Sequence, residues 1–135
     1  MSDEQTIAQG YPPEAHRVVC VDFDGVLYPF GFLYESPEPM PGARRALTRL
    51  RQRGYRIVIF TSRLSPSWLM SSGHSADEQR AYISRLLYRD GIPFDDLTAE
   101  KVPAVAYLDD RAIRVRSGEL DAAVDWLLFE ADVPA

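Results

Sequence analysis

The stretch Val18-Val19-Cys20-Val21-Asp22-Phe23-Asp24-Gly25 decides the fold, because an apolar run there ends in two aspartates separated by one residue. A continuous β-branched run bounded by a breaker is typical of a buried strand in a parallel sheet, which predicts an interior strand over residues 17–22. Side chains two apart on an extended chain point to the same side, so Asp22 and Asp24 can face a common substrate or cation. Open α/β sheets bind their ligands at this carboxyl edge.

The pattern of an apolar strand followed by polar residues recurs along the chain. Residues 55–60 are followed by Thr61-Ser62-Arg63, and residues 104–108 are followed by Asp109-Asp110. Shorter strands are predicted within residues 92–98 and 113–115. The strands alternate with helical segments, which predicts a three-layer, Rossmann-like α/β domain with a mainly parallel sheet.

Three amphipathic helices are predicted, two between these strands and one after the last strand. The first lies between Gly42 and Gly54, and the second spans residues 77–90 and is closed by Gly91. The third is C-terminal and places one set of apolar residues on a single face: Leu120, Ala123, Val124, Leu127 and Leu128. The segments 28–40 and 64–74 are rich in Pro, Gly or Ser, and we predict a flap and a loop there.

Length and composition indicate one domain. The chain has 135 residues and a net charge of -5, which disfavours binding to long duplex nucleic acid. Residues 1–15 are predicted to be a flexible tail, and residues 16–135 a single catalytic domain. No signal peptide is evident, and no apolar run approaches the roughly 20 residues of a membrane span, so we expect a soluble, cytoplasmic protein. Cys20 is the only cysteine, which excludes an intrachain disulfide and predicts a packed, inert thiol.

The predicted strand ends bring one group of polar side chains to one edge of the sheet: Asp22, Asp24, Thr61, Asp109, Asp110 and, just before the fourth strand, Lys101. Carboxylates a few ångströms apart raise one another's pKa or require a cation. Oxygen ligands without His or Cys partners favour Mg²⁺, which is typical of phosphoryl-transfer sites. We therefore expect Mg²⁺ as the cofactor and a phosphorylated substrate.

Each side chain of this group suits one part of phosphate ester hydrolysis. Asp22, at the strand tip, is the candidate nucleophile, and Asp24 is the candidate general acid and base. Thr61, Ser62, Arg63 and Lys101 are candidates for binding the phosphoryl oxygens. The residues Arg63 and Arg111 either contact substrate or orient an aspartate through a forked ion pair.

These residues resemble the haloacid dehalogenase superfamily of phosphohydrolases. Asp22-Phe23-Asp24-Gly25-Val26-Leu27 is similar to its first motif, Thr61 to its second, Lys101 to its third and Asp109-Asp110 to its fourth. Their order and spacing agree over residues 17–116. One departure concerns the lysine motif, in which proline often follows directly, whereas Val102 intervenes here.

The resemblance implies a mechanism and a set of metal ligands. It implies an aspartyl-phosphate on Asp22 and acid/base work by Asp24, which the phosphatases of the superfamily carry and its dehalogenases lack. The implied Mg²⁺ ligands are the carboxylates Asp22, Asp24, Asp109 and Asp110 and the backbone carbonyl of Phe23.

The resemblance also implies a small member without a cap domain, because the flap over residues 28–40 is too short to form one. Such relatives act on large or exposed substrates or borrow a neighbouring subunit as a lid. The expected substrate is therefore a phosphorylated small molecule, such as a nucleotide, or a nucleic-acid end. Trp68 and His74 could stack on a base or sugar, or could instead be a packed Trp and a solvated His.

Two alternatives without turnover remain open. The first is a phosphorylatable or metal-binding regulatory module, since receiver domains also place acids, a hydroxyl residue and a lysine above a parallel sheet. The second is a silent scaffold that recognises a partner through an aromatic flap formed by Tyr28, Phe30, Phe32 and Tyr34. The acid at position 24 discriminates the enzyme from the regulatory module, because a receiver expels no alkoxide.

Overall fold

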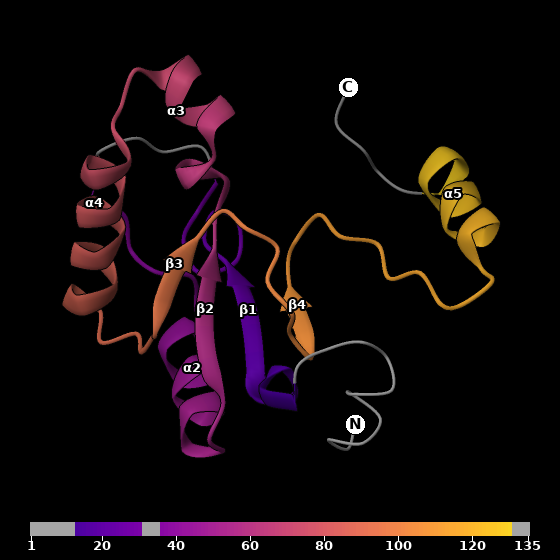
Figure 1. Cartoon of the computed structure of the whole chain (residues 1–135), viewed down its shortest axis with the longest axis horizontal. Helices are drawn as coiled ribbons and strands as arrows, with labels where there is room; N and C mark the ends of the chain where they lie inside the picture. The colour runs from indigo at the N-terminus through magenta and orange to yellow at the C-terminus, as the bar shows by residue number, and fades with distance from the viewer. Residues whose placement is uncertain (1–12, 31–35, 131–135) are drawn as a thin grey trace.

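A parallel sheet organises the chain in this computed structural model, which describes residues 13–30 and 36–130. Four strands of the described residues pair in the order β3-β2-β1-β4, and every pairing is parallel (Figure 1). They are β1 (Val18–Asp22), β2 (Arg56–Phe60), β3 (Asp96–Thr98) and β4 (Ala106–Leu108). The sequence-based prediction of an α/β domain with a parallel sheet is confirmed.

Helices connect the strands. A short 3-10 helix, η1 (Pro13–Arg17), precedes β1, and α2 (Ala43–Gln52) joins β1 to β2. Between β2 and β3 the chain forms η2 (Ser62–Leu64), α3 (Pro66–Ser72) and α4 (Ala76–Arg89). The last helix, α5 (Leu120–Phe129), follows a long irregular segment after β4. The two amphipathic helices predicted between the strands correspond to α2 and α4.

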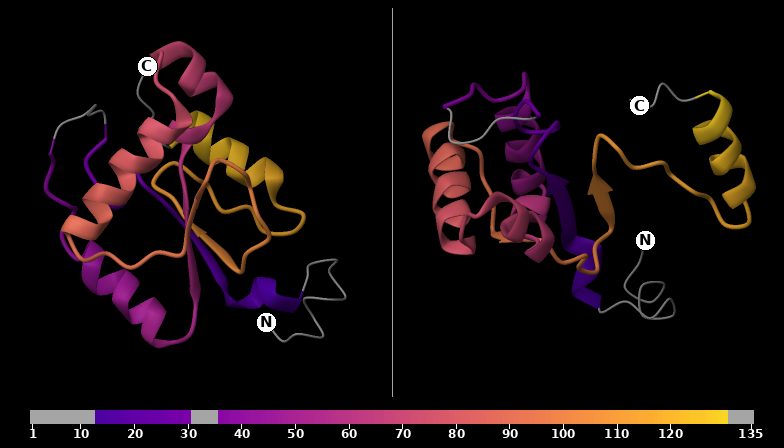
Figure 2. Two further views of the ribbon diagram at one scale, coloured as in Figure 1. Left: turned by 60° about the vertical axis from the view of Figure 1, so that its left-hand side comes forward. Right: turned by 90° about the horizontal axis from the view of Figure 1, so that it is seen from above.

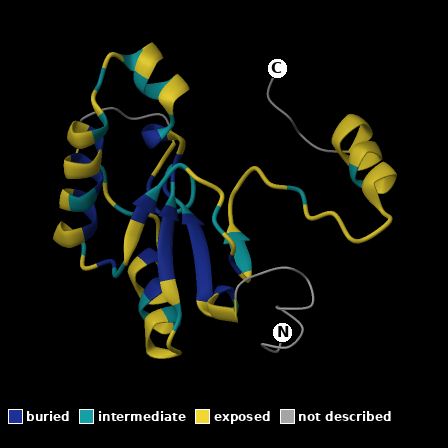
Figure 3. Ribbon diagram, viewed as in Figure 1, coloured by how far each residue is buried: buried dark blue, intermediate teal, exposed yellow. Residues whose placement is uncertain are grey.

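The two faces of the sheet are covered differently. Val19 and Val21 of β1 belong to the larger core, to which α2 contributes Leu47 and α4 contributes Ile83. Val18 and Cys20 alternate with them and belong to a smaller cluster on the other face, together with Ala104. The helices α2 and α4 therefore pack on one face, whereas the smaller cluster on the other face includes Ala104 from the segment before β4. Figure 3 shows β1 and most of β2 as buried.

The C-terminal helix differs from its prediction. The apolar spacing in residues 120–128 predicted one buried face, but α5 contains no buried residue. It lies beyond β4 and apart from the other helices in Figure 1 and in the right-hand view of Figure 2. The spacing of apolar residues established a helix, but it could not establish that the helix packs against the sheet.

Two further local predictions were wrong. Residues 113–115 form no strand, so within the described residues β4 is the outermost strand on its side. The predicted loop over residues 64–74 contains α3, whose first turn is capped by the Ser65 hydroxyl and whose end is marked by Gly73 at φ 75°. Ser and Gly act here as helix caps, although their abundance suggested a loop.

The structure also bears on the predictions made for Cys20, for membrane spans and for the N-terminal tail. Cys20 is fully buried, and burial raises the pKa of its thiol, in agreement with a packed, inert cysteine. None of the helices described between residues 13 and 130 has the length and apolar character needed to cross a bilayer. Most of the predicted tail, residues 1–12, and the flap residues Phe32 and Tyr34 lie outside the described residues.

Candidate metal and phosphate site

Three of the four predicted carboxylates meet at the carboxyl edge of the sheet. Asp22 is the last residue of β1, and Asp109 and Asp110 directly follow β4. The two strands are paired in parallel, with Val21 opposite Leu108, so both chains reach the same edge together. One carboxylate oxygen from each of the three acids lies within 4.8 Å of the other two. We call Asp22, Asp109 and Asp110 the acid cluster.

The acid cluster is electrostatically costly when it holds no cation. Burial first, and then the negative charges of Asp109, Asp110 and Asp24, raise the pKa of Asp22 to about 7, against a hydrogen bond that lowers it. That bond comes from the Phe23 N–H, which donates to Asp22 Oδ1 at 2.8 Å. Asp22 is partly buried whereas Asp109 and Asp110 are exposed, so the cluster opens to solvent on the β4 side.

Gly25 makes room for one member of the cluster. It has φ 84°, a left-handed conformation that glycine adopts without strain. A Cβ atom at this position would lie 2.3 Å from Asp110 Oδ2. The Asp110 carboxylate therefore lies directly against the Gly25 backbone. Gly25 thus permits the turn and also leaves space for this carboxylate.

Asp24, the fourth predicted carboxylate, is held by Arg63. Arg63 Nε donates to Asp24 Oδ2 at 2.8 Å, and Nη2 donates to Asp24 Oδ1 at 2.9 Å. This is the forked ion pair that the sequence suggested as one of two roles for Arg63. Both Asp24 oxygens are engaged by the guanidinium, and Asp24 is not part of the acid cluster.

The hydroxyl residues after β2 have different surroundings. Thr61 is buried, and its backbone N–H donates to the Thr98 carbonyl of β3 at 2.9 Å. Its Oγ1 caps η2 by accepting from the Arg63 N–H, and the hydroxyl proton can still be donated to a ligand. Ser62 is an exposed residue. Its backbone carbonyl accepts a hydrogen bond from the Ser65 N–H.

Lys101 is exposed, and its Nζ lies 5.9 Å from the centre of the Tyr107 ring. Tyr107 belongs to β4, the strand that leads into Asp109 and Asp110. The ammonium group therefore lies near an aromatic ring of β4. The contact of Lys101 with a phosphoryl group stays a prediction.

The backbone carbonyl of Phe23 already has two hydrogen-bond partners within the chain. The resemblance implied that this oxygen binds the metal, but it accepts hydrogen bonds from the N–H groups of Leu27 and Tyr28, each at 3.1 Å. A carbonyl oxygen has two lone pairs, and the tight turn after β1 uses both of them. The Phe23 carbonyl therefore serves the turn.

The donor atoms of the acid cluster fit a hard divalent cation. All three are carboxylate oxygens, which Mg²⁺ and Ca²⁺ prefer, and no thiolate or imidazole belongs to the cluster within the described residues. Mg²⁺ usually binds one or two protein carboxylates and keeps several waters, which an open cluster allows. The arrangement can thus hold a divalent cation between the end of β1 and the residues that follow β4.

The structure also shows the surroundings of Arg111, Trp68 and His74, whose roles the sequence left open. Arg111 donates its backbone N–H to Asp109 Oδ1 at 2.8 Å, and its guanidinium lies 4.5 Å from the centre of the Phe30 ring. Trp68 and His74 stack on each other with ring centres 5.9 Å apart. Both are partly buried, which agrees with a packed tryptophan.

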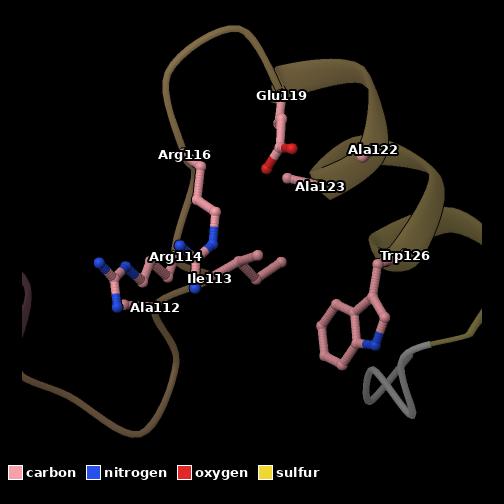
Figure 4. Close-up of a pocket in the computed structure, with 8 residues that line it drawn as sticks. All are labelled: Ala112, Ile113, Arg114, Arg116, Glu119, Ala122, Ala123 and Trp126. Carbon is pink, nitrogen blue, oxygen red and sulfur yellow. The ribbon is translucent and has the colours of Figure 1, made fainter.

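A separate cavity lies between α5 and the segment that follows the acid cluster. It has a volume of about 450 Å³, and its lining includes Ile113, Arg116, Glu119 and Trp126. Figure 4 shows the Trp126 indole of α5 across from Ile113. None of the acid cluster lines this cavity, so the carboxylates and the cavity are distinct features.

The comparisons with known proteins identify the fold. No family model and no curated protein matches the chain. A conserved protein from Bacteroides thetaiotaomicron has a similar structure, with a TM-score of 0.52 and 20% identity over 73% of this chain and 78% of that one. A crystal structure of a target protein from Vibrio cholerae matches with a TM-score of 0.51 and 23% identity, over 73% and 83% of the two chains. These similarities support a Rossmann-like α/β fold.

Proposed function

We propose that this protein is a Mg²⁺-dependent phosphomonoester hydrolase that forms an aspartyl-phosphate on Asp22. The observation that carries the proposal is the acid cluster, in which a strand-end carboxylate lies beside two further carboxylates from the neighbouring strand end. The motif order that resembles the haloacid dehalogenase superfamily supports the same chemistry. Bound Mg²⁺ would be held by Asp22, Asp109 and Asp110, and would offset the negative charge of the phosphoryl group.

In the first step, an Asp22 carboxylate oxygen attacks the phosphorus of the substrate while the bond from phosphorus to the ester oxygen breaks. Asp24 gives its proton to the departing alkoxide. Thr61 and Lys101 donate hydrogen bonds to the phosphoryl oxygens, where negative charge is concentrated. The products of this step are a free alcohol and the aspartyl-phosphate.

In the second step, Asp24 takes a proton from a water molecule whose oxygen attacks the same phosphorus. The bond between phosphorus and Asp22 breaks, inorganic phosphate leaves, and Asp22 is again a carboxylate. Asp24 thereby regains the proton that it gave away in the first step, which closes the cycle.

The proposed substrate is a phosphomonoester whose phosphate is exposed, such as a nucleotide or the phosphorylated end of an oligonucleotide. The two exposed acids on the β4 side support an open site that accepts a large substrate. A net charge of -5 does not favour long duplexes. A cytoplasmic location is part of the proposal, because such substrates are found there.

The test is phosphate release from a panel of phosphomonoesters, with Mg²⁺ and with EDTA. The panel holds nucleotides, sugar phosphates and end-phosphorylated oligonucleotides. We expect turnover that requires Mg²⁺ and falls at least about 10³-fold in Asp22→Asn, because the nucleophile is lost. Asp125→Asn, an exposed carboxylate on α5, is the matched control and should keep wild-type activity.

Trapping the intermediate separates the enzyme from a regulatory module. Acid quenching during turnover should give a phosphorylated chain whose modification maps to Asp22 by mass spectrometry. A phosphorylated Asp22 that persists for hours without phosphate release would contradict the hydrolase and favour a phosphorylatable switch. Turnover that is unchanged in Asp22→Asn would exclude the aspartyl-phosphate mechanism.

A further inference from the structure

Arg63 is a buried arginine surrounded by aromatic rings. The residue is 3% exposed, and its Cζ lies 5.6 Å from the ring centre of Phe23, 5.8 Å from that of Trp68 and 5.9 Å from that of Tyr82. These rings come from the turn after β1, from α3 and from α4. Arginine is less strongly hydrated than lysine and stacks on aromatic faces, so this environment fixes the plane of the guanidinium.

The fixed guanidinium in turn fixes the Asp24 carboxylate. The two hydrogen bonds, at 2.8 and 2.9 Å, define both the position and the plane of the carboxylate. The side chains of Arg63 and Asp24 are 4% and 14% exposed, so solvent screens the pair little. Because separating a buried ion pair leaves an uncompensated charge, Asp24 is strongly held in this orientation.

Because Arg63 holds the Asp24 carboxylate, Asp24 stays outside the acid cluster. Asp24 is only two residues from Asp22, and yet its carboxylate is outside the acid cluster. Each Asp24 oxygen accepts one bond from Arg63 and keeps a second acceptor position. Each oxygen can therefore still accept a hydrogen bond from a water or a substrate group, while the charge of Asp24 is balanced by arginine.

We propose that Arg63 is a positioning residue that keeps Asp24 out of the cation site and holds it ready for acid/base work. The acid/base role of Asp24 in this inference rests on the proposed phosphatase function, whereas its exclusion from the cation site does not. Arg63 thereby divides the four acids into three that hold the cation and one that handles the proton. The sequence had assigned all four to the metal.

Cation binding tests the exclusion of Asp24 from the cation site without any assay of turnover. In Arg63→Met the Asp24 carboxylate loses its fork and can join the acid cluster, and an added carboxylate tightens divalent cation binding. We expect Mn²⁺, measured by isothermal titration calorimetry, to bind roughly five- to tenfold more tightly than to the wild type. Arg85→Met is the matched control, because Arg85 is exposed and lies over the same Tyr82 ring at 5.8 Å. Its affinity for Mn²⁺ should not change.

A double variant separates the released carboxylate from the simple loss of a positive charge. If Asp24 is responsible, Arg63→Met adds no Mn²⁺ affinity in an Asp24→Asn background. An equal gain in both backgrounds would mean that arginine acts only through its charge, and would overturn the proposal. The Asp24→Asn background also lacks the unpaired buried anion, which favours folding of the double variant.

Turnover tests the acid/base role of Asp24. Arg63→Met should lower kcat about 10²- to 10³-fold with little change in KM, approaching the effect of Asp24→Asn, because acid/base catalysis typically contributes this much. Arg63→Lys keeps the charge without the fork, and it should recover part of kcat and give an intermediate Mn²⁺ affinity. Wild-type kcat in folded Arg63→Met, alongside a large loss in Asp24→Asn, would overturn the positioning role.

The two proposals fail differently. If the wild-type protein releases no phosphate from any substrate of the panel, the phosphatase function fails. The Mn²⁺ measurements still test whether Arg63 keeps Asp24 out of the cation site. If the wild type is active but Arg63→Met matches it in Mn²⁺ affinity and kcat, the function stands and the role of Arg63 fails. Circular dichroism establishes that each variant is folded before it is compared.

Discussion

At the scale of single residues, the contact between Gly25 and Asp110 leads to a sharp prediction. In Gly25→Ala the new Cβ would lie 2.3 Å from Asp110 Oδ2, so the carboxylate must move out of the acid cluster. We expect Mn²⁺ affinity to fall about tenfold, because one of three carboxylate ligands is displaced. The backbone strain at φ 84° adds about 1–2 kcal/mol of destabilisation.

Gly42→Ala is the matched control for this variant. Gly42 has φ 82°, and nothing lies within 4 Å of a Cβ placed there. It should show a similar loss in the free energy of unfolding, measured by urea denaturation, with wild-type Mn²⁺ affinity. An equal loss of Mn²⁺ affinity in both variants would mean that backbone strain, rather than the displaced carboxylate, weakens the site.

The raised pKa of Asp22 predicts a pH dependence of stability in the cation-free protein. Folding raises this pKa from an unfolded value of about 3.9 to about 7. The contribution of Asp22 to stability is therefore fully present below about pH 4 and is lost as the pH rises through about 7. Asp22→Asn removes this loss, so at pH 8 its free energy of unfolding should exceed that of the wild type by roughly 2 kcal/mol.

Urea denaturation in EDTA at pH 8 and near pH 4 measures this difference. The advantage of Asp22→Asn should be largest at pH 8 and should nearly disappear at the lower pH, where the wild-type carboxyl is protonated. In the exposed control Asp125→Asn, the difference from wild type should be the same at both pH values. An Asp22→Asn variant that is less stable than the wild type at pH 8 would contradict the raised pKa.

At the scale of secondary-structure elements, the strand ends were the most predictable part of the molecule. The apolar runs before Asp22, Thr61 and Asp109 became β1, β2 and β4, since a buried strand of a parallel sheet needs a continuous apolar sequence. Parallel pairing then brings their carboxyl ends to one edge. The convergence of Asp22, Asp109 and Asp110 follows from these two facts.

Other features depended on contacts that no local pattern contains. The sequence left open whether Arg63 contacts substrate or Asp24. Its pairing with Asp24 is supported by three aromatic rings, which come from the turn after β1, from α3 and from α4. The family resemblance implied a metal at the Phe23 carbonyl, and the sequence could not show that this oxygen accepts two hydrogen bonds from the following turn. The helix α3 was missed because Ser65 and Gly73 are as frequent in loops as in caps.

A hydrogen bond between two elements gives a prediction at this scale. The Tyr28 hydroxyl, from the turn after β1, has one proton that two acceptors share: the Leu86 carbonyl of α4 at 3.0 Å and Asp90 Oδ2 at 2.6 Å. Tyr28→Phe should lower the free energy of unfolding at pH 7 by about 1.5–3 kcal/mol, because one acceptor is charged. Urea denaturation measures the change, and Tyr88→Phe, an exposed tyrosine on the same helix, should have little effect.

The effect of Tyr28→Phe should depend on pH. Arg89 first, and then the Tyr28 hydroxyl, lower the pKa of Asp90 against the opposing effect of burial. A lowered folded pKa gives stability that is present above the unfolded value of about 3.9 and is lost as the pH falls through the folded pKa. The difference between Tyr28→Phe and the wild type should therefore shrink below about pH 4. A difference that grows on acidification would contradict the charged acceptor.

At the scale of the whole molecule, the C-terminal helix is the least integrated part. No residue of α5 is buried, and its large apolar side chains are exposed, among them Leu120, Leu128 and Phe129. The sheet and its two core clusters are built without α5. Apolar burial is the main source of stability, so a helix that buries nothing contributes little to it.

Ending the chain after Gly118 should therefore leave the sheet intact. We expect the thermal unfolding midpoint to change by less than about 3 °C, since 1 kcal/mol corresponds to roughly 2–8 °C for domains of this size. Differential scanning calorimetry measures the midpoint, and Mn²⁺ titration of the shortened chain should give the wild-type affinity because the acid cluster ends at Asp110. Removing an exposed apolar surface should also reduce self-association at high concentration, as measured by sedimentation velocity. A midpoint lowered by 8 °C or more would mean that α5 packs against the sheet in solution.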